Sequence, residues 1–476
     1  MKYFKYLNLI ILASFIFTAC DDEILDNNPY YMGDSADQIY KDENKIAAAN
    51  YGLYDALQNA EFLGGRAQIY VDIRGLDVNP PSYFGLMSSF NPTSNDATIT
   101  LAWQGAYRTV GECNAFLEGI EKAKADNIIT AEVYNIYASD ARFIRGLVYF
   151  YALNLWGQMY VAESSNLGIP LVSKAFDGTT GFTEATKLTR ATITESYNFI
   201  ISDLQFAASN LPATRGDVYK GKATATSTAA NALLSRVYLY MNDYPKAIEY
   251  ANKVSGLTLA PSVFGALSDP ANSTESIFSV AMNFADNPNT NNSLGQHYGA
   301  AKRADITVSS AYLGLLSATD ARKTDCLVVK GSNTYVAKYT ATGNADWAPI
   351  IRYAEVLLNK AEALAKKTGA TTAEVAEAVS LLNQVHGRSE PTKTFLVTDF
   401  PTSGALVEEI LLERRRELAF EGHASFDLFR NAKGIPAGRG AATAAALPYP
   451  SNSFALPIPS DDVTKSAGAL VQNKGY

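Results

Sequence analysis

Cysteine and histidine are scarce in this chain, and their scarcity excludes several kinds of site. The 476 residues contain three cysteines and three histidines. Beyond Cys20, only Cys113 and Cys326 remain, too few for the disulfide framework of a small exported domain. Buried free thiols are the expected state, although the sequence leaves a pairing of these two residues open. No histidine stands in an HExxH motif, so neither a histidine-rich metal site nor an imidazole-based hydrolase is expected.

Long basic tracts and membrane-length apolar runs are also lacking. The formal net charge is -8, and the densest cationic cluster, residues 414–416, is flanked by Glu413 and Glu417. A nucleic-acid partner is therefore not expected. Walker, GxSxG and CxxC motifs do not occur, and none of the 48 acidic residues stands out as a glycosidase carboxylate. The sequence predicts no catalytic residue, no metal and no cofactor, while a structural calcium ion is left open.

The first twenty residues have the features of an export signal. A short basic start precedes an apolar run at residues 7–17, which is too short to span a bilayer. The run is followed by small residues, and the cysteine at the expected cut site resembles a bacterial lipobox. This resemblance implies that Cys20 is lipidated. We expect a signal peptide at residues 1–19 and a lipidated tether at residues 20–30. The alternative is an ordinary secretory signal that contains a cysteine.

Helical periodicity dominates residues 31–476, which we expect to form a single, mainly α-helical domain. Apolar residues between 144 and 155, for example, recur on one helix face. Two helix-turn-helix units, near residues 222–255 and 351–386, resemble tetratricopeptide units with a poorly kept period. Generic antiparallel helix pairs are the alternative interpretation.

Irregular segments between the helices are the candidates for a ligand site. Long irregular segments in a compact protein are often functional, and residues 79–95 and 283–303 carry aromatic side chains. A sugar site needs an exposed aromatic ring beside amide or charged groups. We therefore expect residues 72–84 and 283–302 to meet in a shallow aromatic cleft; the expected ligand contacts are Asp72, Arg74, Tyr83, Phe84, Asn283, Tyr298 and Lys302. The alternative is that these aromatic residues pack their own loops.

A charged block near the C-terminus has a structural rather than a catalytic interpretation. Its members are spaced as one helix face: Glu413, Arg416, Glu417 and Glu421. Ladders of this kind more often stabilise a helix, or fix it to its neighbours, than take part in catalysis. Large aromatic residues in helical patterns are more often core anchors than ligand platforms. The residues expected in the core for this reason are Trp103 and Trp156, and Trp347 is expected there too.

The C-terminal third carries the most specific pattern of the chain. Residues 408–422 have the sequence EEILLERRRELAFEG, followed by His423 and by FDLFR at residues 426–430. This signature, at residues 408–430, resembles that of the SusD/RagB family, the surface lipoproteins of nutrient-uptake systems in Bacteroidetes-type bacteria. Other matching blocks occur in the family's order at residues 140–157, 352–363 and 473–476. Ala424 stands where members often carry arginine, so one local ion pair is not expected here.

The resemblance implies a SusD-like fold, in which tetratricopeptide-like helix pairs form a scaffold with irregular loops and a few short strands. It also implies binding rather than catalysis. Such a lipid-anchored protein sits on the cell outer membrane, exposed at the surface, and captures an oligomeric nutrient, most often a glycan. It delivers this nutrient to a TonB-dependent, SusC-like barrel transporter, on which it acts as a lid. A peptide-capturing lipoprotein is the near alternative, and a surface glycosidase is the distant one.

Overall fold

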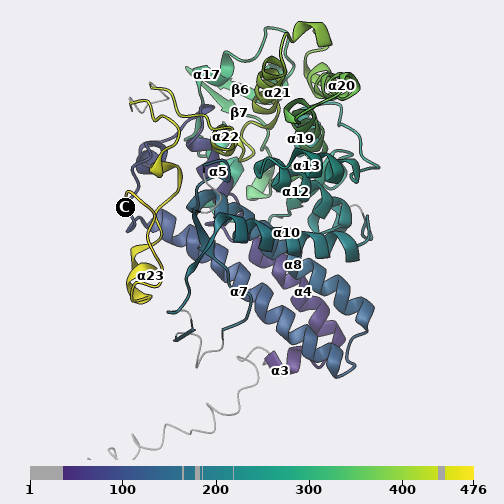
Figure 1. Cartoon of the computed structure of the whole chain (residues 1–476), viewed down its shortest axis with the longest axis vertical. Helices are drawn as coiled ribbons and strands as arrows, with labels where there is room; N and C mark the ends of the chain where they lie inside the picture. The colour runs from purple at the N-terminus through teal and green to yellow at the C-terminus, as the bar shows by residue number, and fades with distance from the viewer. Residues whose placement is uncertain (1–35, 163–165, 177–182, 185, 218, 438–444) are drawn as a thin grey trace, which may run out of the picture.

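The computed structural model describes residues 36–162, 166–176, 183–184, 186–217, 219–437 and 445–476. The predicted signal peptide, Cys20 and the tether lie outside these residues. Helices dominate the described part, and the longer ones are stacked from the lower right to the top of Figure 1. The mainly α-helical architecture expected from the sequence is confirmed.

Two long helices and α4 form the lower part of the stack in Figure 1. Each has a side-chain N-cap, from Asp42, Asp96 or Thr130, which accepts a hydrogen bond from an N–H in the first turn. The three helices pack against one another. Their bounds are α4 (Glu43–Leu57), α7 (Ala97–Ala125) and α8 (Ala131–Trp156).

Helix pairs continue the stack upwards, where α10 packs between α8 and α12, and α13 packs against α19. The pair α12 and α13 and the pair α19 and α20 coincide with the two predicted units near residues 222–255 and 351–386. Asn242, at φ 60°, turns the chain between the first two helices, and Asp243 caps the second. The bounds are α10 (Ile193–Asn210), α12 (Ser227–Tyr240), α13 (Tyr244–Asn252), α19 (Tyr353–Lys366), α20 (Thr372–Ser389) and α21 (Ser403–Leu418).

Short helices occupy much of the chain that the sequence left irregular, including residues 79–95 and 283–303. The α-helical ones are α3 (Ala36–Ile39), α5 (Arg66–Ile73), α6 (Gly85–Ser88), α11 (Lys220–Ala223), α14 (Val263–Leu267), α15 (Asn289–Asn292), α16 (Leu294–Tyr298), α17 (Ser310–Leu313), α18 (Arg322–Asp325), α22 (Ala424–Arg430) and α23 (Ser460–Lys465). The 3-10 turns are η1 (Ser82–Phe84), η2 (Thr342–Asn344), η3 (Val397–Asp399) and η4 (Asn452–Phe454).

Strands are short, and within the described residues they pair as two-stranded antiparallel sheets. The pairs are β1 (Val78–Asn79) with β5 (Thr307–Val308), β2 (Leu167–Pro170) with β3 (Arg190–Thr192), β4 (Ser276–Val280) with β8 (Ala348–Arg352), and β6 (Leu327–Lys330) with β7 (Asn333–Val336). The β4–β8 pair is buried along its whole length and joins the helix stack to the loops beside it.

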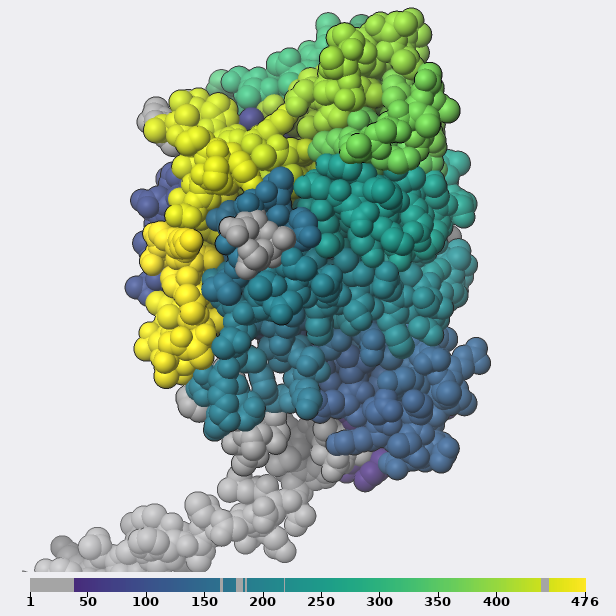
Figure 2. All heavy atoms as spheres, viewed as in Figure 1, coloured from purple at the N-terminus to yellow at the C-terminus, as the bar shows by residue number. Residues whose placement is uncertain are grey.

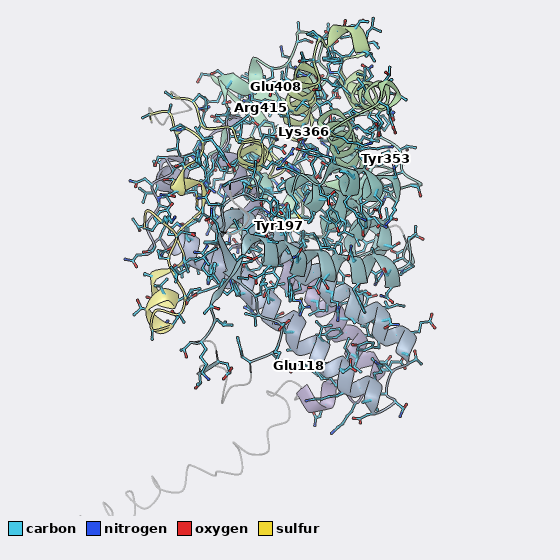
Figure 3. The ribbon with its side chains drawn as sticks, in the orientation of Figure 1. Glu118, Tyr197, Tyr353, Lys366, Glu408 and Arg415 are labelled. Carbon is cyan, nitrogen blue, oxygen red and sulfur yellow. The ribbon has the colours of Figure 1, made fainter. Side chains whose placement is uncertain are left out.

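The main core extends through the stack from Ile46 to Leu470. Trp103 and Trp156 belong to it, with ring centroids 5.2 Å apart, so their prediction as core anchors is confirmed. In Figure 3, Tyr197 marks the middle of the stack; its hydroxyl donates to Asn154 Oδ1 inside the core. Figure 2 shows the C-terminal segment, coloured yellow, lying over the left side of this face. The core therefore depends on both ends of the described chain.

The two thiols beyond Cys20 are both buried in the fold. Cys113 and Cys326 are free cysteines, as the sequence favoured. Burial raises the pKa of both thiols, that of Cys326 to about 11. Because the thiolate is the reactive form, both residues are chemically inert at neutral pH.

The charged face of α21 is buried in a group of side chains that we call the ion network. Arg352 Nη1 lies 2.5 Å from Glu417 Oε1, and Arg352 Nε lies 2.8 Å from Glu421 Oε2. The spacing predicted Glu421 on the same helix face, and this part of the prediction is wrong. Helix α21 ends at Leu418, and the chain turns at Phe420, φ 68°, before it reaches Glu421. The network's members are Glu275, Asp320, Arg322, Lys338, Arg352, Arg388, Glu413, Glu417 and Glu421.

Within this network the charges compensate one another. Burial alone would raise the pKa of Glu417, but the guanidinium groups of Arg388, Arg352 and Arg322 outweigh burial and hold that pKa well below its usual value. These side chains are almost completely buried, so they do not face a ligand at the surface. The arrangement favours the structural interpretation of the charged block over the catalytic one.

Candidate functional site

The two segments expected to form an aromatic cleft do meet in the fold. The hydroxyl of Tyr298 donates to Asp72 Oδ2 at 2.9 Å. Tyr83 donates to Asp305 Oδ2 at 2.7 Å, and β1 pairs with β5 beside it. The interactions that join the segments lie inside the fold. Several of the predicted side chains are therefore buried.

The predicted cleft is wrong in its exposure at four positions, because Asp72, Arg74, Phe84 and Tyr298 are buried. The Asp72 carboxylate accepts the N–H of Gly422, and an Arg74 Nη2 N–H donates to the backbone oxygen of Phe454 at 2.7 Å. Each side chain thus holds α5 and its neighbours to the C-terminal region. They are contacts of the core, not surfaces for a ligand.

The other three predicted contacts are wholly or partly accessible. Tyr83 is 49% exposed, with the guanidinium of Arg303 5.1 Å from its ring centroid. Asn283 is exposed, and its Oδ1 accepts two backbone N–H groups of its own turn. Lys302 is partly buried and pairs with Asp346 at 2.9 Å. Ligand contact by these three residues stays a prediction.

The buried carboxyl of Asp72 predicts a measurable dependence on pH. Burial raises its pKa from 3.8 to about 7, and the hydrogen bonds from Tyr298 and Gly422 offset only part of that rise. The folded state therefore holds this proton more tightly than the unfolded state does. The stability that this difference in proton binding gives the fold is lost as the pH rises through about 7. In thermal unfolding, the melting temperature of Asp72→Asn minus that of wild type should therefore increase as the pH is raised from 5 to 8.

The exposed Asp286→Asn is the control, and its melting temperature relative to wild type should not change over the same pH range. A difference between Asp72→Asn and wild type that stays constant from pH 5 to pH 8 would contradict the raised pKa of Asp72.

A hollow on another part of the molecule brings exposed aromatic rings together. We call it the aromatic pocket, and its volume is about 210 Å³. Tyr51 is 52% exposed and Tyr219 is 48% exposed, which is high for such large rings. Its lining residues are Tyr51, Tyr54, Asp55, Leu57, Gln58, Tyr219, Lys220, Ala223, Thr224, Phe278, Val280, Ala281 and Asp286.

One face of α4 supplies the first wall of the aromatic pocket. Tyr51, Tyr54, Asp55 and Gln58 are spaced at i, i+3, i+4 and i+7, so they project from the same side of the helix. Gln58 follows the last residue of α4, and its Nε2 donates to the backbone oxygen of Ala281 at 2.5 Å. This bond fixes the end of α4 to the chain that leaves β4, where the second wall begins.

Tyr54 forms a fixed floor between these walls. Its hydroxyl donates to Asp140 Oδ1 at 2.6 Å and accepts the N–H of Ala225 at 2.9 Å. Arg215 Nη2 lies 2.7 Å from the same Asp140 carboxylate. Burial raises the pKa of Tyr54 well above its ordinary value, and the Asp140 charge raises it further. The phenol therefore stays protonated and keeps its position, while Tyr51 beside it is exposed.

A ring outside the lining supports Tyr219. The rings of Tyr219 and Trp347 meet edge to face, with centroids 5.0 Å apart. Trp347 Nε1 donates to the Met282 oxygen, and the indole packs partly on the core, as expected. Tyr51 and Tyr219, which are far apart in the sequence, thus present their rings to solvent in one pocket.

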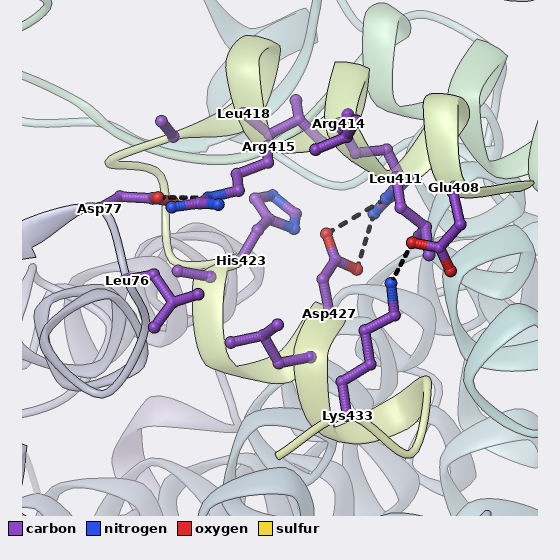
Figure 4. A pocket seen from close by; sticks show the side chains of 14 residues that line it. Leu76, Asp77, Glu408, Leu411, Arg414, Arg415, Leu418, His423, Asp427 and Lys433 are labelled. Carbon is purple, nitrogen blue, oxygen red and sulfur yellow. Dashed lines mark hydrogen bonds and ion pairs between the residues drawn. The ribbon is translucent and has the colours of Figure 1, made fainter. Parts of the chain in front are cut away.

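Two other hollows in the described residues have at most one exposed ring each. Figure 4 shows one of about 110 Å³ between α21 and α22, with leucines in its walls. Its charges pair with each other, Arg415 with Asp77 and Lys433 with Glu408. A larger groove of about 530 Å³ beside α7 is mostly apolar, and Phe176 is its exposed ring. The aromatic pocket is therefore the best candidate for a sugar site.

The residues that make this pocket were not predicted from the sequence. The predicted contacts include Asn283, in the same loop as Asp286, but no residue of α4 and not Tyr219. The spacing of Tyr51, Tyr54, Asp55 and Gln58 on one helix face was available as a signal. Nothing in the sequence placed Tyr219 beside them.

Comparison with known proteins agrees with this architecture. A model of the SusD family matches residues 278–476, and a model described as starch-binding associating with outer membrane matches residues 23–239. A crystal structure of a SusD superfamily protein from Bacteroides fragilis is 31% identical, covers 90% of this chain and 99% of its own, and superposes with a TM-score of 0.80. The chain belongs to the SusD family.

Other members of the SusD family extend the comparison. SusD-like protein P2 of Formosa agariphila is 25% identical over 541 residues, which cover 100% of both chains. A SusD-like protein of Bacteroides ovatus is 28% identical over 245 residues, 50% of this chain but only 40% of that protein. Surface glycan-binding protein A from Bacteroides thetaiotaomicron, in complex with laminarihexaose, shares the fold at 19% identity, with a TM-score of 0.71 over 90% of this chain.

No described helix combines the length and the apolar character needed to cross a membrane. Within the same residues, histidine, cysteine, aspartate and glutamate form no group of three or more that could hold a metal ion.

Proposed function

We propose that this protein captures an oligomeric nutrient, a glycan, in the aromatic pocket. The observation that carries the proposal is the pair of exposed rings in one pocket, Tyr51 and Tyr219, beside the carboxylates of Asp55 and Asp286. Aromatic faces stack on the apolar side of a sugar ring, and carboxylate or amide groups bind its hydroxyls. The glycan-bound relative of the same fold supports this proposal.

The proposed setting is the outer face of the outer membrane. A lipid on Cys20 would anchor the chain there, and membership of the SusD family together with the match to an outer-membrane-associated family model supports this location. The captured glycan would then pass to a TonB-dependent, SusC-like transporter. The protein would act as the binding partner of that transporter and not as an enzyme.

The test is a double substitution of exposed rings, Tyr51→Ala with Tyr219→Ala. Because both side chains are about half exposed, the melting temperature should change little, whereas the Kd for a bound oligosaccharide should rise at least tenfold, or about 1.4 kcal/mol. Isothermal titration calorimetry with oligosaccharides found by screening measures this. Phe176→Ala, at an exposed ring in the groove beside α7, is the matched control and should bind as wild type does.

Two results would contradict the proposal. If Tyr83→Ala abolished binding while the double variant bound normally, the ligand would sit beside residues 72–84 and not in the aromatic pocket. Because Asp55 and Asp286 also place two carboxylates in the pocket, release of shorter products from an incubated oligosaccharide would favour a surface glycosidase instead.

A further inference from the structure

The aromatic pocket has an uneven balance of charge. Asp55 and Asp286 are exposed at its lining, and among the described residues neither carboxylate forms an ion pair. No arginine occurs among the described residues that line the pocket. Lys220 is the lining residue that carries a positive charge, and Asp217 stands at the start of its own helical turn, where it accepts the N–H of Lys220. The lining therefore carries more negative than positive charge.

Two cations on neighbouring chain segments are already used inside the fold. Arg215 Nη2 lies 2.7 Å from Asp140 Oδ1. The ammonium group of Lys222 donates a hydrogen bond to the backbone oxygen of Ser276, at the start of β4. The negative side chains, in contrast, act on the exposed ring itself. Burial is the main cause that raises the pKa of the Tyr219 hydroxyl, and the charges of Asp286 and Asp217 raise it further. A ligand stacked on Tyr219 would thus lie in a negative field.

The hydrogen-bonding groups of the pocket point to the same class of ligand. The carboxylates of Asp55 and Asp286 only accept hydrogen bonds. The Gln58 amide has used one N–H on Ala281, which leaves one N–H donor and the Oε1 acceptor. An acceptor-rich lining suits the hydroxyl donors of an uncharged sugar. A uronate or sulfate group would bring acceptors and a third negative charge, with no arginine to bind it.

We propose that the aromatic pocket is selective for uncharged oligosaccharides and rejects chains that carry uronate or sulfate groups. This inference rests on the proposed function, since it assigns the ligand class of the same pocket. The selectivity comes from Asp55 and Asp286, which repel an anionic sugar held against Tyr219. Because both carboxylates are exposed, salt screens the repulsion.

The experiment compares hexasaccharides of equal length. Neutral probes are hexamers of glucose, mannose and xylose with different linkages, and acidic probes are hexamers of galacturonate and mannuronate together with a sulfated galactan hexamer. Calorimetry should show at least tenfold tighter binding of the best neutral probe than of any acidic probe at low salt. The gap should narrow as sodium chloride is raised.

The double variant Asp55→Asn with Asp286→Asn removes both charges and keeps two acceptor oxygens. Because an amide oxygen is a weaker acceptor than a carboxylate, its Kd for the best neutral probe should rise, while the ratio of acidic to neutral Kd falls at least tenfold. Asp126→Asn, at the exposed C-cap of α7, is the control and should leave that ratio unchanged. An unchanged ratio in the double variant would overturn the role of the two carboxylates.

The possible failures can be told apart. If an acidic probe binds wild type as tightly as the neutral ones, and Tyr219→Ala weakens it, the pocket binds glycans and only the charge inference fails. If no hexasaccharide binds but a lysine-rich peptide does, both the charge inference and the proposed glycan function fail, and the peptide-capturing alternative holds. Binding of neither kind of probe overturns both proposals as well.

Discussion

Replacing Arg352 by methionine is expected to lower the free energy of unfolding by about 3–5 kcal/mol, the usual cost of breaking a buried ion pair from one side. Arg352 contacts the carboxylates of Glu275, Glu417 and Glu421, all of which are buried. Without the guanidinium, these charges lose a shared counterion in a region that water does not reach. Urea unfolding at pH 7 measures the change.

Acid should reduce the difference between wild type and the methionine variant. The pKa of Glu421 is lowered, because Arg352 and Lys338 outweigh the effect of burial. A carboxylate with a lowered pKa stabilises the fold above its unfolded pKa, about 4.5, and this stabilisation is lost as the pH falls through the folded value. The cost of losing Arg352 should therefore be largest above pH 5 and smaller towards pH 3.

An exposed pair provides the comparison for this substitution. Arg108 and Glu112 form an i,i+4 pair on α7 in which the arginine side chain is 76% exposed. Such pairs contribute little because water and salt screen them. Arg108→Met should leave the midpoint of unfolding almost unchanged. If Arg352→Met and Arg108→Met lose equal stability, the ion network does not stabilise the fold as its buried contacts imply.

Cys20→Ala is expected to remove almost all of the protein from the membrane fraction. The alanine chain cannot be lipidated at that position, and no described helix could replace the lipid as an anchor. Fractionation of cells after a high-salt wash, together with incorporation of labelled fatty acid, measures the effect. The product should be either soluble or retained as the uncleaved precursor.

Cys113→Ser is the control for Cys20→Ala, because it changes a thiol that is buried inside the fold. Its membrane fraction should equal that of wild type, even if the substitution lowers stability. A Cys20→Ala protein that still resists the salt wash would show that the lipobox interpretation is wrong and that residues 1–19 are not a lipoprotein signal.

Local patterns in the sequence predicted most of the helical fold. The pairs α12 and α13 and α19 and α20 followed from helical spacing and from a turn at residues 242–245. Trp103 and Trp156 followed from their place on apolar faces. These features depend on neighbours within a few turns, which a sequence shows directly. The burial of Asp72 and Tyr298 could not be predicted in this way, because it depends on their contact with each other and on Gly422, which is distant in the sequence.

The candidate site was the hardest part to predict, for a related reason. Asp72 and Arg74 are polar and stand beside aromatic residues, a combination that is also typical of exposed sugar sites. Only the tertiary contacts show that they bond to backbone groups at the far end of the chain. The aromatic pocket, in contrast, is exposed, but no single segment of the sequence marks it. Its rings come from α4, from the turn before α11 and from β4, and no sequence period connects these segments.

The long-range bonds of α5 also bear on when this chain can finish folding. Asp72 accepts a hydrogen bond from Gly422, 350 residues later, and Arg74 donates to Phe454, 380 residues later. Contacts of such sequence separation form slowly, since the intervening chain must first be closed into a loop. Helix α5 therefore cannot complete its packing until nearly the whole polypeptide is present. If the chain is exported as proposed, these contacts of α5 would remain unformed during passage across the membrane and would form only when the C-terminal residues arrive.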